Sequence, residues 1–208
     1  MPADRCVYIV DDDDAVRDSL SVLLEAKAYA VKSFASAPEF LLAAPSLPTG
    51  CLIVDIRMPE MDGLELQQRL IERALHFPMI VITGHGDVPL AVRAMKAGAI
   101  DFIEKPFASD AILESLGVAL SRLAAPNERD PSAAAAAAKL ALLSPREHQV
   151  LEGLLAGLPN KSIAYDLAIS SRTVEIHRAR VMDKMQARSL SELVRLALAG
   201  GIDPKPRE

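Results

Sequence analysis

Short apolar runs rich in β-branched residues alternate with longer segments of helical periodicity over the first 125 residues of the chain. Several of these runs are apolar throughout, as expected for strands that are covered on both faces of a sheet. The intervening segments repeat apolar residues at intervals of about 3.6, for example over 64–75 and 88–99. This alternation predicts an α/β domain with a five-stranded, doubly wound parallel sheet and five helices. The five expected strands are VYIV (7–10), AVKSF (30–34), CLIV (51–54), MIVIT (79–83) and AIDFI (99–103).

Acidic, hydroxyl and amine side chains follow the expected strands at the ends where such sheets bind their ligands. Asp11 and Asp12 follow the first strand, Asp55 the third, Thr83 ends the fourth, and Lys105 follows the fifth. Three carboxylates gathered at one edge would repel one another without a divalent cation, and oxygen ligands favour Mg²⁺ over zinc. The set suits phosphoryl transfer, in which a carboxylate attacks and the cations and hydroxyl stabilise the phosphoryl oxygens.

Each of these residues also has an ordinary structural explanation. A lone aspartate at a strand end is usually a solvated loop or a helix cap, a lone Thr83 a turn residue, and a lone Lys105 a surface charge. Their joint occurrence at the ends of four strands favours a site. Within the run of four aspartates, Asp14 is predicted to be the N-cap of the first helix, and Asp13 is given no role.

The chain from Ser144 onward has the pattern of four short helices. The sequence SPRE (144–147) predicts a capping box, with a first helix that reaches about Ala156. A short helix over about 160–168 is followed by a turn and by a basic helix that starts near Ser171, with Ser170 as its N-cap. With a last helix over about 190–199, this is the outline of an all-α helix-turn-helix domain.

The two parts differ in charge and are joined by an alanine-rich segment. Residues 1–125 hold 11 Lys and Arg against 18 Asp and Glu, a net of −7, whereas residues 144–208 hold 10 against 8, a net of +2. This asymmetry predicts two domains with different partners. In the segment between them, Asp130–Pro131 is a plausible helix start, which favours a partly helical, semi-rigid linker over a flexible tether. The predicted domains are 1–123, a linker over 124–143, and 144–208.

Localisation follows from what the sequence lacks. No apolar run reaches the roughly 18 residues that a membrane span requires, and the N-terminus has no signal-peptide layout. Cys6 and Cys51 lie in apolar runs, which predicts free thiols in a reducing compartment. The expectation is a cytoplasmic protein without a membrane partner.

The motifs at the strand ends resemble the receiver domain of two-component response regulators. The matching stretches are VDDD (10–13), VDIRMPEMDG (54–63), TGHG (83–86) and EKPF (104–107), within a resemblance that covers residues 4–123. The resemblance implies that a partner histidine kinase phosphorylates Asp55. It also implies that Mg²⁺, with Mn²⁺ as an alternative, is held by Asp11, Asp12, Asp55 and the carbonyl of Arg57.

Other roles are implied by the same resemblance. Lys105 would contact the phosphoryl oxygens, Thr83 would turn toward them on activation, and Phe102 would swing inward with it. For Phe102, ordinary core packing is the alternative. Family members have a cis peptide bond at the position of Lys105–Pro106.

The C-terminal part resembles the LuxR-type helix-turn-helix over residues 140–200, with LPNKSIAYDLAISSRTVEIHR as its informative core. Glu175 could accept from a cytosine amine, whereas Val174 and His177 are expected to pack against neighbouring helices. A merely solvated basic helix is the alternative. Expected in the major groove are Thr173, Glu175, Ile176 and Ala179. Candidates for phosphate contacts are Lys161, Arg172, Arg178, Arg180 and Lys184.

The pairing of the two domains resembles the NarL/FixJ class of response regulators, and residues 82–107 resemble the FixJ-type regulators of oxygen-controlled nitrogen-fixation genes. This implies a transcriptional activator that is not an enzyme in turnover, that acts with RNA polymerase, and that has a sensor histidine kinase as partner. Phosphorylation would pair two receivers through about residues 87–121, and the dimer would bind two half-sites of promoter DNA. The unphosphorylated receiver would either hold the recognition helix or fail to dimerise.

Two other classes of protein share some of these features with response regulators. A haloacid-dehalogenase-type phosphohydrolase also has aspartates after its first strand and uses Mg²⁺, but its nucleophile lies in that first cluster. Here the pair Asp11–Asp12 is separate from Asp55, and there is no cap domain. A DNA-binding scaffold whose receiver has lost its chemistry would lack motif residues, and all of them are present.

Overall fold

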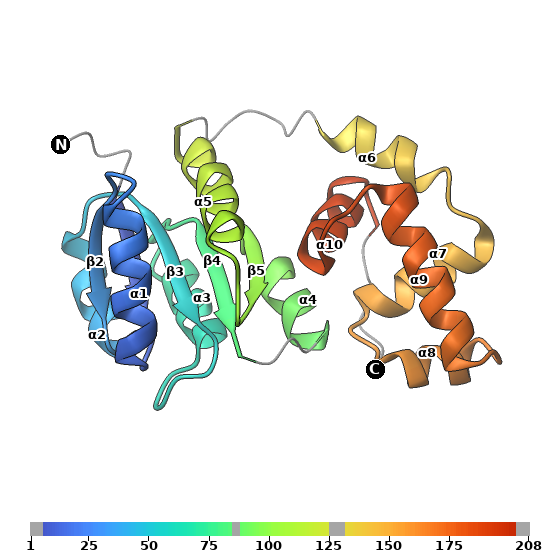
Figure 1. Ribbon diagram of the computed structural model, residues 1–208, viewed down its shortest axis with the longest axis horizontal. Coiled ribbons are helices and arrows are strands. Elements are labelled where there is room, and N and C mark those ends of the chain that lie inside the picture. The colour runs from blue at the N-terminus through green and yellow to red at the C-terminus, as the bar shows by residue number, and fades with distance from the viewer. Residues whose placement is uncertain (1–5, 85–87, 125–131, 203–208) are drawn as a thin grey trace. The chain divides into compact units, whose positions relative to one another are not determined.

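The computed structural model describes residues 6–84, 88–124 and 132–202 (Figure 1). The chain divides into two compact units, one of residues 1–86 with 96–127 and the other of residues 87–95 with 128–208. Each unit is described by itself. Outside the described residues lie His85 and Gly86 of the TGHG motif and the predicted helix start at Asp130–Pro131.

A five-stranded parallel sheet forms the centre of the first unit, in the order β2-β1-β3-β4-β5. This confirms the doubly wound α/β fold predicted from the alternation of apolar runs. The last strand begins at Asp101 rather than at the predicted residue 99. Just before it, the main-chain N–H of Ile100 donates to the carbonyl of Met79. The strands are β1 (Cys6–Val10), β2 (Ala30–Phe34), β3 (Cys51–Asp55), β4 (Met79–Thr83) and β5 (Asp101–Glu104).

Helices α1 and α5 cover one face of the sheet. On this face a buried cluster joins alternate residues of the central strands, such as Ile9, Ile53 and Ile82, to Leu20 of α1 and Leu116 of α5. Because β1 and β3 are buried on both faces, their carboxyl ends are held firmly. Asp11 comes directly after β1, and Asp55 is the last residue of β3. The helices that follow the five strands are, in chain order, α1 (Asp14–Glu25), α2 (Ala37–Ala43, continued by the short η2, Ala44–Ser46), α3 (Gly63–Glu72), α4 (Val88–Lys96) and α5 (Ser109–Ala124).

Aromatic packing fills the opposite face, next to α2. The ring of Phe40 lies 5.2 Å from Phe34, 5.5 Å from Phe77 and 5.9 Å from Tyr8, centroid to centroid. Cys51 is in register with Val7 and shares its face, so Cys6, one residue earlier, points to the other face. The two free thiols are therefore on opposite sides of the sheet.

Five helices form the described part of the C-terminal half, residues 132–202. Four of them match the predicted helix-turn-helix pattern, and the capping box at Ser144 and Glu147 is present as predicted. The fifth, α6, falls within the predicted linker and packs against α10, where a Cβ on Gly200 would overlap Leu140. The domain boundaries stay a prediction. The helices are α6 (Ser132–Leu140), α7 (Pro145–Leu155), α8 (Asn160–Asp166), α9 (Ser171–Met185) and α10 (Leu190–Ala199).

No helix within the described residues, 6–84, 88–124 and 132–202, is both long enough and apolar enough to cross a bilayer.

Candidate functional site

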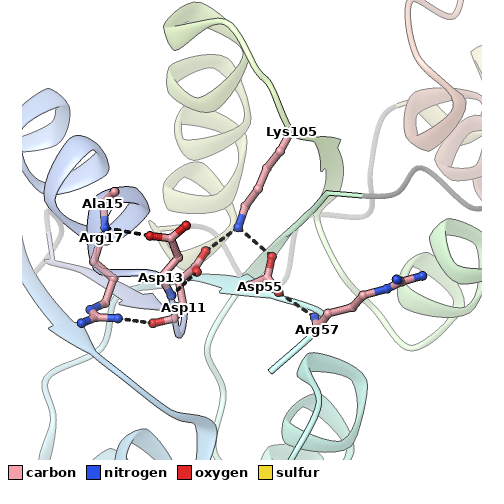
Figure 2. A network of polar contacts seen from close by, with 7 residues as sticks. All are labelled: Asp11, Asp13, Ala15, Arg17, Asp55, Arg57 and Lys105. Atoms are coloured by element: carbon pink, nitrogen blue, oxygen red, sulfur yellow. Dashed lines mark hydrogen bonds and ion pairs between the residues drawn. The ribbon is translucent and has the colours of Figure 1, made fainter. Parts of the chain in front are cut away.

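Asp11 is fixed at the end of β1 by contacts to both of its carboxylate oxygens. It is fully buried, and its Oδ1 accepts from the main-chain N–H of Asp13 at 3.0 Å. Its Oδ2 lies 2.7 Å from the Nζ of Lys105 (Figure 2). Asp12 is exposed, at a bend between the end of β1 and the start of α1. The adjacent aspartates therefore occupy very different environments.

The cap of the first helix is Asp13, so the prediction that Asp14 has this role was wrong. Asp13 has the extended backbone that an N-cap requires, with φ −85° and ψ 112°, and its carboxylate accepts from the N–H of Ala15 at 2.9 Å. Asp14 is already the first helical residue, and its carboxylate pairs with Arg17 one turn later.

Asp55 ends β3, a strand that lies between β1 and β4. Its side chain is nearly buried, with Oδ1 at 2.8 Å from the Nζ of Lys105. Its Oδ2 accepts from the main-chain N–H of Arg57 at 2.6 Å, while the Arg57 side chain extends away (Figure 2). The structure therefore brings together Asp11, Asp55 and Lys105, as their positions at the strand ends predicted.

The ammonium of Lys105 pairs with two buried carboxylates, those of Asp11 and Asp55. Burial raises the pKa of Asp55 above its ordinary value, although the hydrogen bond and charge of Lys105 oppose this effect. For Lys105, burial lowers the pKa, but the contacts with Asp11 and Asp55 outweigh burial and leave it raised. With two carboxylates against one ammonium, the buried cluster has one negative charge in excess, and this excess favours the binding of a cation.

Thr83 lies on β4, which pairs with the strand of Asp55, and Phe102 lies on β5, one strand further along the sheet. Thr83 ends β4 and is fully buried, and its carbonyl accepts from the main-chain N–H of Lys105 at 2.7 Å. Phe102 is half-buried on β5, in register with Val81. The Lys105–Pro106 peptide bond is cis, as the resemblance implied.

The donor atoms at this edge are those that Mg²⁺ prefers, since they are all oxygens of carboxylates or of the main chain. The excess negative charge of the buried pair Asp11 and Asp55 gives a cation something to neutralise. Among the described residues, however, no three acidic, histidine or cysteine side chains lie close enough to form a metal site by themselves. Asp12, the third predicted ligand, is exposed and is not part of the buried pair.

Two residues that matter to this site were not singled out from the sequence. Arg17 donates to the carbonyl of Asp11 and pairs with Asp14. Gly63 lies directly behind Asp55: a Cβ there would be 2.6 Å from the carbonyl oxygen of Asp55. The sequence offers a signal for Gly63 alone, namely the Asp-Gly pair at the start of a helix.

We expect Gly63→Ala to destabilise the first unit by about 1–3 kcal/mol, because the methyl group would have to displace main-chain atoms rather than a flexible side chain. Chemical unfolding of the two proteins measures this. Gly117→Ala is the matched control, since a Cβ at Gly117 meets nothing within 4 Å and alanine favours the helix α5. Equal stabilities of the Gly63 variant and the wild type would contradict the close contact.

The second candidate site is the pair of helices α8 and α9. Ser170 caps α9 as predicted: its hydroxyl accepts from the N–H of Thr173 at 3.1 Å. Val174, Val181 and Met185 hold the inner side of α9 in the core. The outer side carries several of the residues predicted to meet DNA, and Ile176 there is 46 % exposed. Exposed on α9 are Arg172, Glu175, Ile176, Ala179 and Arg180, with Lys161 exposed on α8.

Three of the remaining residues have partners or positions inside the fold. Thr173 and Arg178 are half-buried, and the hydroxyl of Thr173 lies 2.8 Å from that of Ser170. His177 is also half-buried, beside the buried Val174, in agreement with its predicted packing role.

Lys184 has two acceptors within the protein. Its Nζ lies 2.7 Å from a carboxylate oxygen of Glu147 and donates to the carbonyl of Leu142 at 3.0 Å. The hydrogen bond from Lys184, together with that from the N–H of Ser144, lowers the pKa of the buried Glu147 to about 2. The ammonium thus stabilises a buried carboxylate, which makes Lys184 a weaker candidate for a phosphate contact than the exposed arginines.

Comparison with known protein families finds two matches along the chain. Residues 7–117 match the response regulator receiver domain, and residues 141–197 match the LuxR family of bacterial regulatory proteins. The two ranges contain, respectively, the Asp55 cluster and the helices α8 and α9.

Similar proteins extend over nearly the whole chain. The transcriptional regulatory protein FixJ of Rhizobium meliloti is 54 % identical over 201 residues, which are 97 % of this chain and 98 % of the relative. FixJ of Azorhizobium caulinodans is 52 % identical over 98 % of this chain and 97 % of its own. The crystal structure of full-length FixJ from B. japonicum is 50 % identical, with a TM-score of 0.57 and coverage of 95 % and 98 %.

Proposed function

Because the chain belongs to the response regulators that join a receiver domain to a LuxR-type DNA-binding domain, we propose that it is phosphorylated on Asp55 and then binds promoter DNA. The observation that carries this proposal is the buried Asp55 carboxylate at the end of β3, 2.8 Å from Lys105 and separate from the acidic pair at β1. A receiver implies a sensor histidine kinase as the source of the phosphoryl group.

In the proposed transfer, a carboxylate oxygen of Asp55 attacks the phosphorus of a phosphohistidine. The P–N bond breaks, its electron pair stays with the imidazole, and an acyl phosphate forms on Asp55. Lys105 neutralises charge on the phosphoryl oxygens, because it already lies against Asp55. The proposed product is an acyl phosphate on the chain itself, so the proposed role is that of a phosphoacceptor rather than of an enzyme that turns over a substrate.

Receiver domains bind Mg²⁺ at their acidic phosphorylation site, and a divalent cation supplies charge neutralisation during phosphoryl transfer. We propose that Asp11, Asp12, Asp55 and the carbonyl of Arg57 hold Mg²⁺ here, with Mn²⁺ as an alternative. The oxygen donors and the excess negative charge of the buried pair support this choice. The exposed Asp12 would then join through its position next to Asp11.

The switch is proposed to run through Thr83 and Phe102. Thr83 would turn toward the phosphoryl group, and the half-buried Phe102 would swing inward with it. The surface of α4, β5 and α5 would then change and pair two receivers, so that two recognition helices meet half-sites about one helical turn apart. Dimerisation supports tighter binding because the second half-site is bound at a high effective concentration.

The regulated genes are proposed from the relatives. The most similar proteins given above are FixJ regulators, so genes of nitrogen fixation under oxygen control are the proposed targets, activated together with RNA polymerase. A cytoplasmic location follows from a role on promoter DNA. The proposed domains are 1–123 for the receiver, 124–143 for the linker and 144–208 for DNA binding.

The stoichiometry of phosphoryl uptake separates this function from that of a phosphohydrolase. With excess acetyl phosphate and Mg²⁺, we expect about one phosphoryl group per chain and tighter protection of promoter fragments in a footprint. A phosphohydrolase would instead release phosphate over many cycles, with no change in DNA protection. A chain that takes up one phosphoryl group but stays monomeric in light scattering would contradict the dimerisation step alone.

For DNA binding, Arg178→Ala is expected to weaken affinity and to flatten its dependence on salt. Each phosphate contact that is lost reduces the slope of log K against log salt by about 0.9. Titration of a promoter duplex at several salt concentrations measures this slope. Arg69→Ala is the control, because Arg69 lies on α3 and pairs with Glu65. An unchanged slope would remove Arg178 from the set of phosphate contacts.

A further inference from the structure

We propose that Arg17 is a positioning residue of the phosphorylation site, which holds the turn that presents Asp11 and Asp12 to Mg²⁺. Arg17 lies on α1, one turn after the run of aspartates at 11–14. It is not one of the proposed Mg²⁺ ligands. Its contribution to Mg²⁺ rests on the proposed function of this site. Its contacts with the turn are features of the structure alone.

The guanidinium of Arg17 joins the end of β1 to the first turn of α1. Its Nη1 donates to the main-chain carbonyl of Asp11 at 2.6 Å (Figure 2). Its Nη2 pairs with the carboxylate of Asp14. The side chain of Arg17 is 14 % exposed and that of Asp14 is 86 % exposed, so the contact with the Asp11 carbonyl is better protected from water than the ion pair. An arginine has the planar fork of donors needed to hold two oxygen acceptors at once.

The other contacts of Asp11 show what this tie adds. The carboxylate of Asp11 is held by the N–H of Asp13 and by Lys105, and both contacts act on the side chain. Its main-chain N–H donates to the carbonyl of Phe34 at the longer distance of 3.3 Å. The bond from Arg17 is the shorter main-chain contact. It fixes the direction in which the chain leaves β1, and Asp12 is the next residue.

Position and charge predict opposite effects of removing Arg17. As a bare positive charge near the site, Arg17 would repel Mg²⁺, so its removal would tighten binding. Removing Arg17 would also leave the carboxylate of Asp14 unpaired, but that carboxylate is 86 % exposed and water screens its charge, so we expect the loss of the tie to the main chain to be the larger effect. Outer contacts that orient ligands typically change metal affinity by 10–100-fold when they are removed.

Isothermal titration of the full chain with MgCl₂, in the absence of a phosphodonor, tests this. We expect Arg17→Met to raise the Mg²⁺ dissociation constant about tenfold. Arg69→Met is the matched control, because Arg69 also pairs with a carboxylate one turn away, Glu65 at 3.2 Å, but on α3. It should leave the constant unchanged. An unchanged or lowered constant in Arg17→Met overturns the proposal.

A second variant covers the case in which Arg17→Met does not fold. Arg17→Lys keeps a cation that can reach one of the two acceptors, so we expect a rise of about threefold, between the wild type and the methionine variant. No rise, or a fall, in this variant overturns the proposal as well.

Phosphoryl uptake provides an independent measurement. In Arg17→Met the Mg²⁺ concentration for half-maximal uptake should rise, while the rate at saturating Mg²⁺ stays within about twofold of the wild type. A fall in the maximal rate alone would indicate general damage to the fold. A wild type that binds Mg²⁺ but takes up no phosphoryl group would contradict the proposed function and leave the Mg²⁺ test of Arg17 valid.

Discussion

Asp55→Asn is expected to abolish phosphoryl uptake, with a loss on the order of a thousandfold or more, since it removes the attacking carboxylate. The amide cannot form an acyl phosphate, and no second carboxylate occupies the same position between Lys105 and the N–H of Arg57. Incubation with radiolabelled acetyl phosphate and Mg²⁺, followed by denaturing electrophoresis, measures the label on the chain. Phosphodonor-dependent protection of promoter DNA should disappear with it.

The same substitution should make the first unit more stable. Asp11 and Asp55 share one ammonium, and burial raises the pKa of Asp55, so the native state bears a cost for its ionised form. A neutral amide removes that cost, and we expect a gain in the free energy of unfolding at pH 7. Asp18→Asn, an exposed position on α1, should change neither label nor stability. Labelling of the Asp55 variant at another residue would contradict the site assignment.

Lys184→Met is expected to destabilise the C-terminal helices by about 2 kcal/mol, because it leaves the carboxylate of Glu147 buried without its cation. This loss of stability is at the lower end for a buried pair, because the Lys184 side chain is 36 % exposed and water screens part of the interaction. The ion pair links the start of α7 to the end of α9, the recognition helix. Urea unfolding followed by circular dichroism measures the loss.

The pH dependence of this variant gives a sharper test. The pKa of Glu147 falls from an ordinary 4.5 to about 2 in the native state. The pair therefore contributes its full stability above pH 4.5 and loses it as the pH falls toward 2. The difference between the wild type and Lys184→Met should be largest at pH 7 and should shrink between pH 4.5 and 2. A difference that is constant with pH would show that lost packing, rather than lost charge, causes the effect.

The double variant Glu147→Gln, Lys184→Met separates the pair from the cap. Glutamine can still accept from the N–H of Ser144, so the capping box is kept while the buried charge is removed. We expect it to recover about 1 kcal/mol of the loss in the single variant. Arg69→Met, which breaks an exposed pair with Glu65, should cost no more than about 0.5 kcal/mol.

The fold and the cluster of Asp11, Asp55 and Lys105 were predictable because their signals are local or follow from topology. Apolar strands and amphipathic helices alternate in the sequence, and parallel strands bring their carboxyl ends to one edge whatever the details of packing. Asp11, Asp55 and Lys105 could thus be placed together from three positions in the chain. The capping box at Ser144 and the N-cap at Ser170 likewise depend on residues only three apart.

Other assignments depended on contacts that local patterns do not show. Periodicity and strand direction specify the sheet, the helices and the edge of the sheet where the carboxylates gather. The folded structure is needed to show that Asp13 rather than Asp14 caps α1, that Arg17 turns back to the carbonyl of Asp11, and that Lys184 pairs with Glu147, 37 residues away in the chain. The physical reason is that a charged side chain takes whichever acceptor the folded backbone brings within reach, and no spacing in the sequence specifies that acceptor.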